Sequence, residues 1–121
     1  MAFAALSLVL LFSTAILGYD EKYSEIDVDS VIADDELFMS YLNCFVDKGP
    51  CTAKYAEDYK GILPEVIKEG CAKCTDDQKE KMRKLVKTVH DKKPEMAVAL
   101  QAKYDPNHEY EKTFTAFLTG H

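Results

Sequence analysis

The sequence predicts a small all-α domain carrying two local disulfide bonds. Apolar residues recur along the chain at the three-and-four spacing of helical faces. No segment shows the sustained alternation of a strand. The four cysteines form two close pairs, Cys44 with Cys51 and Cys71 with Cys74, at the two ends of one helix-like segment. We therefore expect a central helix with a staple at each end and amphipathic helices packed around it.

The four cysteines allow three pairings, and their number alone does not decide between them. Loop entropy slightly favours a long-range bond such as Cys51–Cys71, because the short local loops are worth only about 2 to 2.5 kcal/mol each. Geometry favours the local bonds. A helix over about 53–69 would hold Cys51 and Cys71 roughly 25 Å apart, far beyond the reach of a disulfide. We expect the bonds Cys44–Cys51 and Cys71–Cys74.

Residues 1–18 are apolar almost throughout and contain no charged side chain, and after Tyr19 the chain becomes charged with Asp20 and Glu21. This pattern predicts a secretory signal peptide over 1–18 and one domain over 19–121, with an uncleaved membrane anchor as the alternative. We expect a secreted, extracellular protein without stable membrane insertion, in a compartment where disulfides form. The net charge of −6, without a basic stripe, argues against nucleic acid as a partner.

The first elements follow from capping residues and apolar faces. Residues 19–27 are polar with isolated apolar positions and predict an extended arm lying on the body. A short helix then follows, capped by Asp27, Asp29 or Ser30. The next helix is expected over about 35–47, because acidic residues at its start favour the helix dipole and apolar residues share one face.

The later elements bring the expected number of helices to five or six. In the helix over about 53–69, Pro64 predicts either a kink one turn earlier or a new turn. Thr75–Gln78 has the form of a capping box, Pro94 suits the start of another helix, and Asp105–Pro106 is expected to cap and begin the last one. The helix after the capping box has a polar face that we expect in water: Lys79, Glu80, Lys81, Arg83, Lys84 and Lys87.

Motifs for catalysis or metal binding are missing from the sequence. The Cys-x-x-Cys pair resembles half of a zinc site or a redox centre, but the other cysteine pair is too widely spaced for zinc and no α/β pattern is present. His90, His108 and His121 lie outside hydrolase and metalloprotease motifs, so we expect them on the solvated surface. We expect no catalytic residue, no metal and no cofactor.

Aromatic residues are frequent for so small a domain, with seven Tyr and six Phe but no Trp. They could fill a solid core. Amphipathic helices that are stabilised by disulfides could equally leave an apolar cavity between them. Periodicity alone does not separate these two interpretations.

Five stretches around the cysteines form a highly specific combination that spans about 22–106. They are Lys22-Tyr23 with Ile26–Asp29, Tyr41 with Asn43–Thr52, Leu63-Pro64, Gly70–Thr75 with Gln78-Lys79, and Lys103–Pro106. This combination resembles the insect chemosensory protein family, also called OS-D-like. The chain departs from the family pattern in two places. One residue more than usual separates Cys51 from Cys71, and Ala97 stands where the family tends to have Trp.

The resemblance implies six helices around an internal hydrophobic channel, two disulfides between sequence neighbours, and transport of long-chain alcohols, acids, esters and similar semiochemicals. Tyr23 or Tyr41 would offer a polar group to the ligand. Carried onto this sequence, the expected ligand-binding residues are Tyr23, Ile26, Val31, Tyr41, Leu42, Phe45, Ile62, Leu63, Val66, Val86, Val89 and Leu100.

We therefore expect a monomeric, secreted carrier of small hydrophobic molecules in extracellular fluid such as sensillar lymph, and not an enzyme. The alternative is a secreted signalling or developmental factor that acts through a protein partner. That alternative requires an exposed apolar patch outside the channel, for which the last helix is the candidate through Phe114, Phe117 and Leu118.

Overall fold

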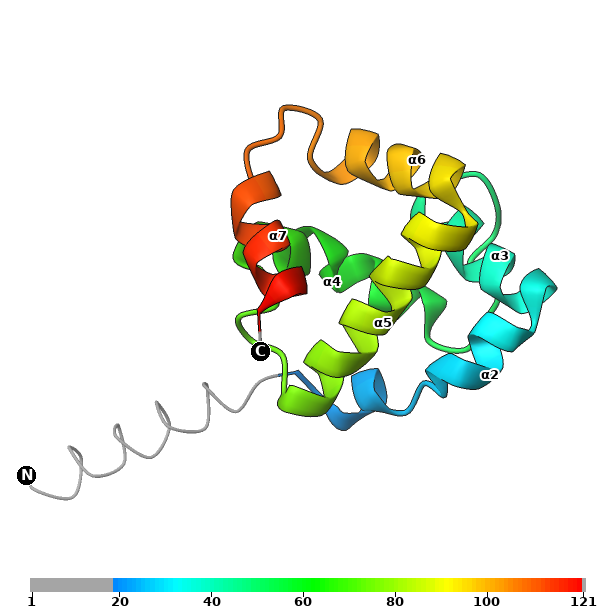
Figure 1. Cartoon of the computed structure of the whole chain (residues 1–121). Helices are drawn as coiled ribbons and strands as arrows, with labels where there is room; N and C mark the ends of the chain where they lie inside the picture. The colour runs from blue at the N-terminus through cyan, green and yellow to red at the C-terminus, as the bar shows by residue number, and fades with distance from the viewer. Residues whose placement is uncertain (1–18, 121) are drawn as a thin grey trace, which may run out of the picture.

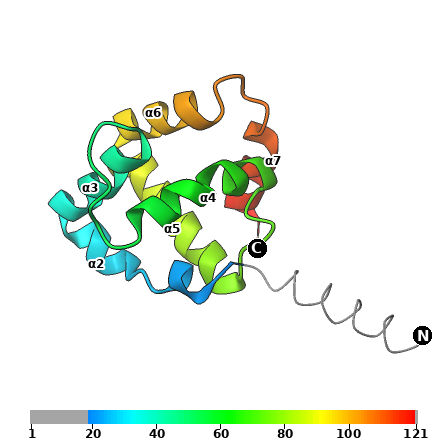
Figure 2. The same cartoon turned by 180° about the vertical axis from the view of Figure 1, so that it is seen from behind.

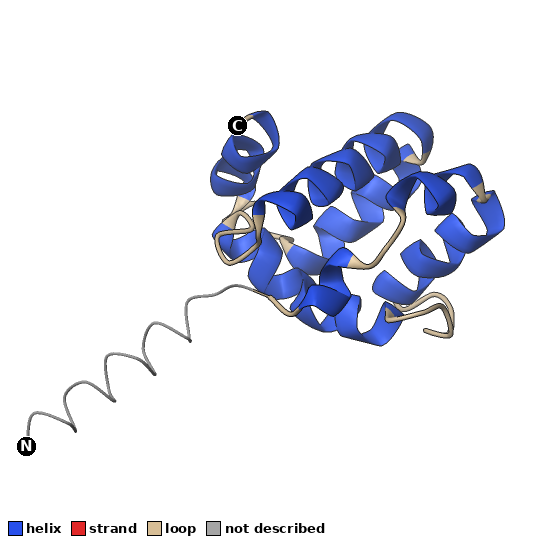
Figure 3. Ribbon diagram, turned by 90° about the horizontal axis from the view of Figure 1, so that it is seen from below, coloured by secondary structure: helices blue, strands red, loops and turns tan. Residues whose placement is uncertain are grey.

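The structure, a computed structural model, describes residues 19–120, and helices are the only regular elements in this range (Figure 3). The predicted all-α class with six α-helices is confirmed. The signal peptide predicted over 1–18 lies outside the described residues. In chain order the elements are η1 (Glu21–Ser24), α2 (Val28–Ala33), α3 (Asp35–Phe45), α4 (Ala56–Glu69), α5 (Asp76–Lys92), α6 (Pro94–Tyr104) and α7 (Glu111–Thr119).

Helices α4 and α5 lie on opposite sides of the interior. In Figure 1, α5 crosses the front of the molecule and α4 passes behind it, and Figure 2 shows the reverse. Helix α4 packs against α3, α6 and α7, whereas α5 packs against η1, α2 and α6. The other helices therefore form the rim that joins these two sides.

Side-chain caps mark the start of three α-helices, α2, α3 and α5. The carboxylate of Asp27 accepts a hydrogen bond from the first turn of α2, and that of Asp34 accepts one from the first turn of α3. At the start of α5, Thr75 and Gln78 form the predicted capping box. Each cap satisfies backbone donors that the first turn of a helix leaves without partners.

Three boundaries around the central helix differ from the sequence prediction. Helix α3 ends at Phe45 rather than near residue 47, because the backbone of Asp47 is left-handed with φ 61°. Helix α4 begins at Ala56 rather than near residue 53, because Tyr55 is also left-handed with φ 60°. Helix α4 runs through Pro64, so the prediction of a new turn there is wrong.

The last helix was predicted to begin at Asp105–Pro106, and this prediction is wrong: α7 begins at Glu111. The physical reason is the buried carboxylate of Asp105. It accepts hydrogen bonds from the backbone N–H groups of Glu109 at 2.7 Å and Tyr110 at 3.2 Å. These bonds fold residues 106–110 back as a loop, and α7 starts only after that loop.

Both disulfides join the predicted partners, Cys44 with Cys51 and Cys71 with Cys74. Their sequence separations are 7 and 3, so each closes a local loop. No free cysteine remains. The two bonds therefore fix the connections before and after α4 without linking helices that are distant in sequence.

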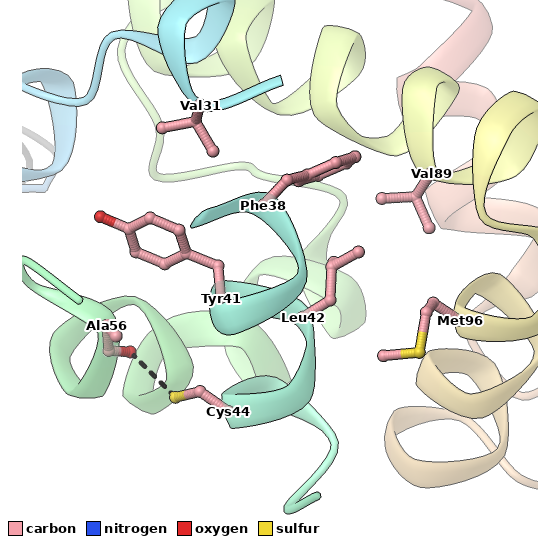
Figure 4. Packing of buried hydrophobic residues seen from close by; sticks show 8 residues of the cluster. All are labelled: Val31, Phe38, Tyr41, Leu42, Cys44, Ala56, Val89 and Met96. Carbon is pink, nitrogen blue, oxygen red and sulfur yellow. Dashed lines mark hydrogen bonds between the residues drawn. The ribbon is translucent and has the colours of Figure 1, made fainter. Parts of the chain in front are cut away.

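Two packed clusters of buried side chains occupy opposite ends of the molecule. The larger one joins α2, α3, the start of α4, α5 and α6, and Figure 4 shows its members converging: Val31, Phe38, Tyr41, Leu42, Cys44, Ala56, Val89 and Met96. The smaller one joins the end of α4 to α7 through Val66, Cys71 and Phe117. The interior between these clusters is not filled.

Candidate ligand-binding cavity

An apolar cavity of about 350 Å³ lies in the interior, and every helix contributes to its wall. Its volume falls at the lower end of the range found for small-molecule pockets. Periodicity alone allowed either a solid core or a cavity between the helices, and the structure shows the cavity. The structure confirms the internal hydrophobic space that the family resemblance implied.

All twelve residues predicted to bind ligand lie on this wall. Tyr23 comes from η1, and Ile26 from the segment that leads into α2. The others come from α2 to α6: Val31, Tyr41, Leu42, Phe45, Ile62, Leu63, Val66, Val86, Val89 and Leu100. Their contact with a ligand stays a prediction.

Further wall residues were not among the predicted ones. Phe38 is 2 % exposed and lies three and four residues before Tyr41 and Leu42, so its spacing placed it on the same face. Met82 and Leu85 continue the apolar stripe of α5 in the same way. The wall also includes Gln78 and Lys81, whose polarity gave no such signal.

Helix α7 turns its large apolar residues inward. Phe114 and Leu118 line the cavity, and Phe117 is buried in the smaller cluster. These three residues therefore do not form the exposed apolar patch that the alternative function would require on this helix. Among residues 19–120, the large hydrophobic side chain with high exposure is Val98 on α6, at 68 %.

Five tyrosine rings line the cavity, but most of their hydroxyl groups are bound elsewhere. Four donate to acceptors of the protein: Tyr19 to Glu65 at 3.0 Å, Tyr41 to the Lys54 carbonyl at 2.7 Å, Tyr59 to the Lys22 carbonyl at 3.2 Å, and Tyr104 to the Phe45 carbonyl at 2.6 Å. The fifth, Tyr23, has no hydrogen-bond acceptor among the described residues. These rings present apolar faces to the cavity and satisfy their polar ends in the protein.

Burial raises the pKa of three tyrosine side chains on the wall, those of Tyr41, Tyr59 and Tyr104. The pKa of Tyr59 rises to about 12. Burial and the hydrogen bond to Glu65 raise the pKa of Tyr19 as well. Desolvation disfavours the phenolate in each case, so these side chains add no charge to the cavity.

Two charged side chains on the wall, Lys81 and Asp105, bind other groups of the protein. Lys81 was predicted to point into water, and this is wrong: its ammonium group donates to the Ser24 carbonyl and pairs with Asp77 at 3.1 Å. The long side chain of Lys81 lies along the wall and reaches Ser24 in η1. Asp105 likewise uses both carboxylate oxygens on backbone N–H groups.

Residues 19–120 contain no group of three His, Cys, Asp or Glu side chains placed to hold a metal ion. In the same range, no helix is long and apolar enough to cross a membrane.

A family model described as "Insect pheromone-binding family, A10/OS-D" matches residues 19–112. The chain belongs to this family. A curated relative, ejaculatory bulb-specific protein 3 of Drosophila melanogaster, is 39 % identical over 116 residues, which cover 96 % of this chain and 90 % of the relative. The resemblance to the insect chemosensory proteins seen in the sequence is thus confirmed.

Solved structures of A10/OS-D relatives share the fold of this chain. A chemosensory protein in complex with bromo-dodecanol has a TM-score of 0.70 and 30 % identity, covering 79 % of this chain and 95 % of that one. Antennal chemosensory protein A6 from the moth Mamestra brassicae has a TM-score of 0.65 and 29 % identity, covering 83 % and 92 %. The helical arrangement of this chain is therefore shared with these two chemosensory proteins.

Proposed function

We propose that this A10/OS-D protein is a secreted, monomeric carrier of long-chain hydrophobic molecules in extracellular fluid. The observation that carries the proposal is the cavity of about 350 Å³, whose wall is apolar and whose tyrosine hydroxyls are mostly bound to the protein. The bromo-dodecanol complex of a chemosensory relative supports a ligand with one alkyl chain. The apolar stretch over 1–18 supports secretion.

The expected ligands are alcohols, acids and esters with one alkyl chain. Each buried methylene contributes about 0.8 kcal/mol, so a twelve-carbon chain gains roughly 10 kcal/mol before costs. Lost translational freedom and chain ordering offset part of this gain, which leaves micromolar affinity. Chain length therefore governs affinity more than the head group does.

Tyr23 is the residue that we assign to the polar head of the ligand. Tyr41 was the other candidate, but its hydroxyl already donates to the Lys54 carbonyl. The hydroxyl of Tyr23 has no acceptor among the described residues, and its ring lies on the wall 5.8 Å from that of Tyr59. A single hydroxyl contacts an alcohol, an ester or an acid equally well, which fits a carrier of broad range.

Competition binding tests this function. Purified protein is loaded with N-phenyl-1-naphthylamine and titrated with alcohols and acids of twelve to eighteen carbons. We expect displacement at micromolar concentrations, with affinity rising with chain length until the cavity is full. Failure of every compound to compete at about 10 µM would contradict the carrier function. Mass spectrometry of protein secreted from insect cells, produced from the full chain, tests cleavage after residue 18.

A further inference from the structure

The N-terminal segment, residues 19–27, forms part of the cavity wall and contacts both α4 and α5. Tyr19, Tyr23 and Ile26 of this segment line the cavity. The segment was predicted to be extended, but it contains the single turn η1, none of whose residues is buried. It lies at the bottom of the molecule in Figure 1, where it crosses the start of α5.

Side chains attach residues 19–26 of this segment to α4 and α5, whereas Asp27 at its end is the cap of α2. The backbone hydrogen bonds donated by Tyr23 and Glu25 end on Asp20 and Lys22, inside the segment itself. On the α4 side, Tyr59 donates to the Lys22 carbonyl, and the Lys22 ammonium pairs with Asp58 at 3.2 Å. A segment held in this way can detach without unwinding any helix.

On the α5 side the attachment is made mainly by Gln78, which is only 6 % exposed. Its Nε2 donates to the Asp20 carbonyl at 3.2 Å and to Ser24 Oγ at 3.1 Å, and it lies 3.5 Å from the Tyr19 carbonyl oxygen. Lys81 adds a bond to the Ser24 carbonyl. One buried amide group thus binds both ends of η1.

The oxygen and the nitrogen of the Gln78 amide bind different partners. Its Oε1 accepts from the Thr75 backbone N–H at 3.0 Å and completes the capping box of α5. Its Nε2 faces the segment and plays no part in the cap. The capping box alone requires only an acceptor at this position. The buried donor is therefore explained by the segment that it holds.

We propose that Gln78 is a positioning residue that holds residues 19–27 closed over the cavity, and that ligands enter and leave when this segment detaches from α5. This inference rests on the proposed carrier function. It adds the route of exchange, which the cavity alone does not define. Because the same segment carries Tyr23, the head of the ligand sits at the moving wall.

The decisive variant is Gln78→Glu. A carboxylate keeps the acceptor for the Thr75 N–H but offers no donor to the Asp20 and Tyr19 carbonyls. Stopped-flow mixing with N-phenyl-1-naphthylamine, followed by chasing with dodecanol, gives both rate constants. We expect both rate constants to increase, dissociation by about tenfold, because the open state becomes more populated. Since Gln78 lies on the wall, its replacement by a carboxylate also weakens binding, so the faster association is the change that reports opening.

A matched control separates the effect of losing the Gln78 Nε2 bonds from the effect of losing the α5 cap. Thr75→Ala weakens the capping box and leaves the Nε2 bonds in place, and Thr75 is not on the cavity wall. We expect this variant to melt at a lower temperature with unchanged rate constants. A second measurement needs no ligand: in Gln78→Glu, amide hydrogen exchange of Tyr23 and Glu25 should accelerate while exchange within α6 stays the same.

The results distinguish this inference from the carrier function. If Gln78→Glu leaves the ligand rate constants and the amide hydrogen exchange unchanged, the proposed role of Gln78 is wrong, but the carrier function is unaffected. Equal acceleration in Thr75→Ala would also overturn that role, because the effect would then come from α5 as a whole. If the unsubstituted protein binds no probe, both proposals fail. Should Gln78→Glu not fold, Ser24→Ala removes one Nε2 partner and should give a smaller acceleration of the same sign.

Discussion

Three tyrosine side chains turn their apolar rings towards the cavity and bind their polar hydroxyl groups to the protein. Tyr41, Tyr59 and Tyr104 place a ring on the cavity and donate their hydroxyls to backbone carbonyls. Because those carbonyls belong to other segments, each tyrosine also ties the wall to its neighbour. A polar atom on the inner surface would cost affinity for an alkyl chain, so this arrangement suits an apolar ligand.

Val86 offers a test of the inner wall at the scale of one residue. It is half-buried on α5 and lines the cavity. We expect Val86→Asp to abolish binding of N-phenyl-1-naphthylamine, because the unpaired carboxylate brings water into an apolar space. Fluorescence titration measures this, and circular dichroism checks that the helices remain.

The control for Val86→Asp is Lys87→Ala, one residue further along the helix. Lys87 is exposed and does not line the cavity. This variant should bind the probe as the unsubstituted protein does. Equal losses in the two variants would show that the inner and outer faces of α5 are wrongly assigned.

Asp47 gives a prediction about acid stability. Hydrogen bonds from Lys103 and Lys60 lower the pKa of its carboxyl to about 2 from an ordinary value of 3.8. The folded protein thus binds this proton less readily than the unfolded chain does. The stabilisation is complete above about pH 4 and disappears as the pH falls towards 2.

Asp47→Asn isolates this charge, since Asn tolerates the left-handed backbone at φ 61°. We expect the variant to melt at a lower temperature than the unsubstituted protein at pH 6, with the difference vanishing by about pH 2. Melting curves at several pH values measure it. A difference that stays constant over this range would mean that the two lysine contacts do not act through charge.

Sequence reasoning identified apolar wall residues far better than polar ones. Twelve apolar or aromatic positions were placed by helical spacing and the family resemblance, and all twelve lie on the wall. Gln78 and Lys81 were missed, because their role depends on a segment more than fifty residues away in the chain. Helical periodicity describes one helix at a time and carries no information on such partners.

At the scale of elements, the junction between α4 and α7 depends on a glycine. Gly70 ends α4 with φ 62°, and a Cβ there would lie 3.2 Å from both the Thr113 carbonyl oxygen and its methyl group. We expect Gly70→Ala to lower the free energy of unfolding by at least about 1 kcal/mol, through the left-handed backbone and pressure on α7. Urea denaturation measures the change.

Gly61 supplies the matched control within the same helix. It lies inside α4, is exposed, and a Cβ added there would meet nothing within 4 Å. Gly61→Ala should therefore raise the free energy of unfolding by about 0.5 to 1 kcal/mol. If both alanine variants shift stability in the same direction, the assignment of Gly70 to a special backbone position is wrong.

The boundaries of the elements were predictable where a local cap decides them and not where a longer contact does. Thr75–Gln78 was recognised as the start of α5 because the whole cap lies within four residues. Asp105 was taken for the cap of the last helix, yet its carboxylate holds the loop of residues 106–110. Asp favours both roles, and the sequence does not distinguish them.

At the scale of the whole molecule, neither disulfide bond joins helices from opposite sides of the cavity. The disulfides Cys44–Cys51 and Cys71–Cys74 both link sequence neighbours. Reduction should lower the free energy of unfolding by up to about 4 kcal/mol, because two short loops are released in the unfolded chain. Thermal melts with and without reductant measure this. The helical circular dichroism at 25 °C should persist, and its loss would show that the staples are required to form the helices.

The aromatic composition of the wall gives the protein an optical property of its own. The chain contains seven tyrosines and no tryptophan, and five of those tyrosines surround the cavity. Its ultraviolet emission therefore comes from phenol groups, most of which surround the cavity. A conjugated polyene taken up inside would accept their excitation and quench the emission, whereas a saturated chain would not, so the emission of the unlabelled protein distinguishes these two kinds of compound.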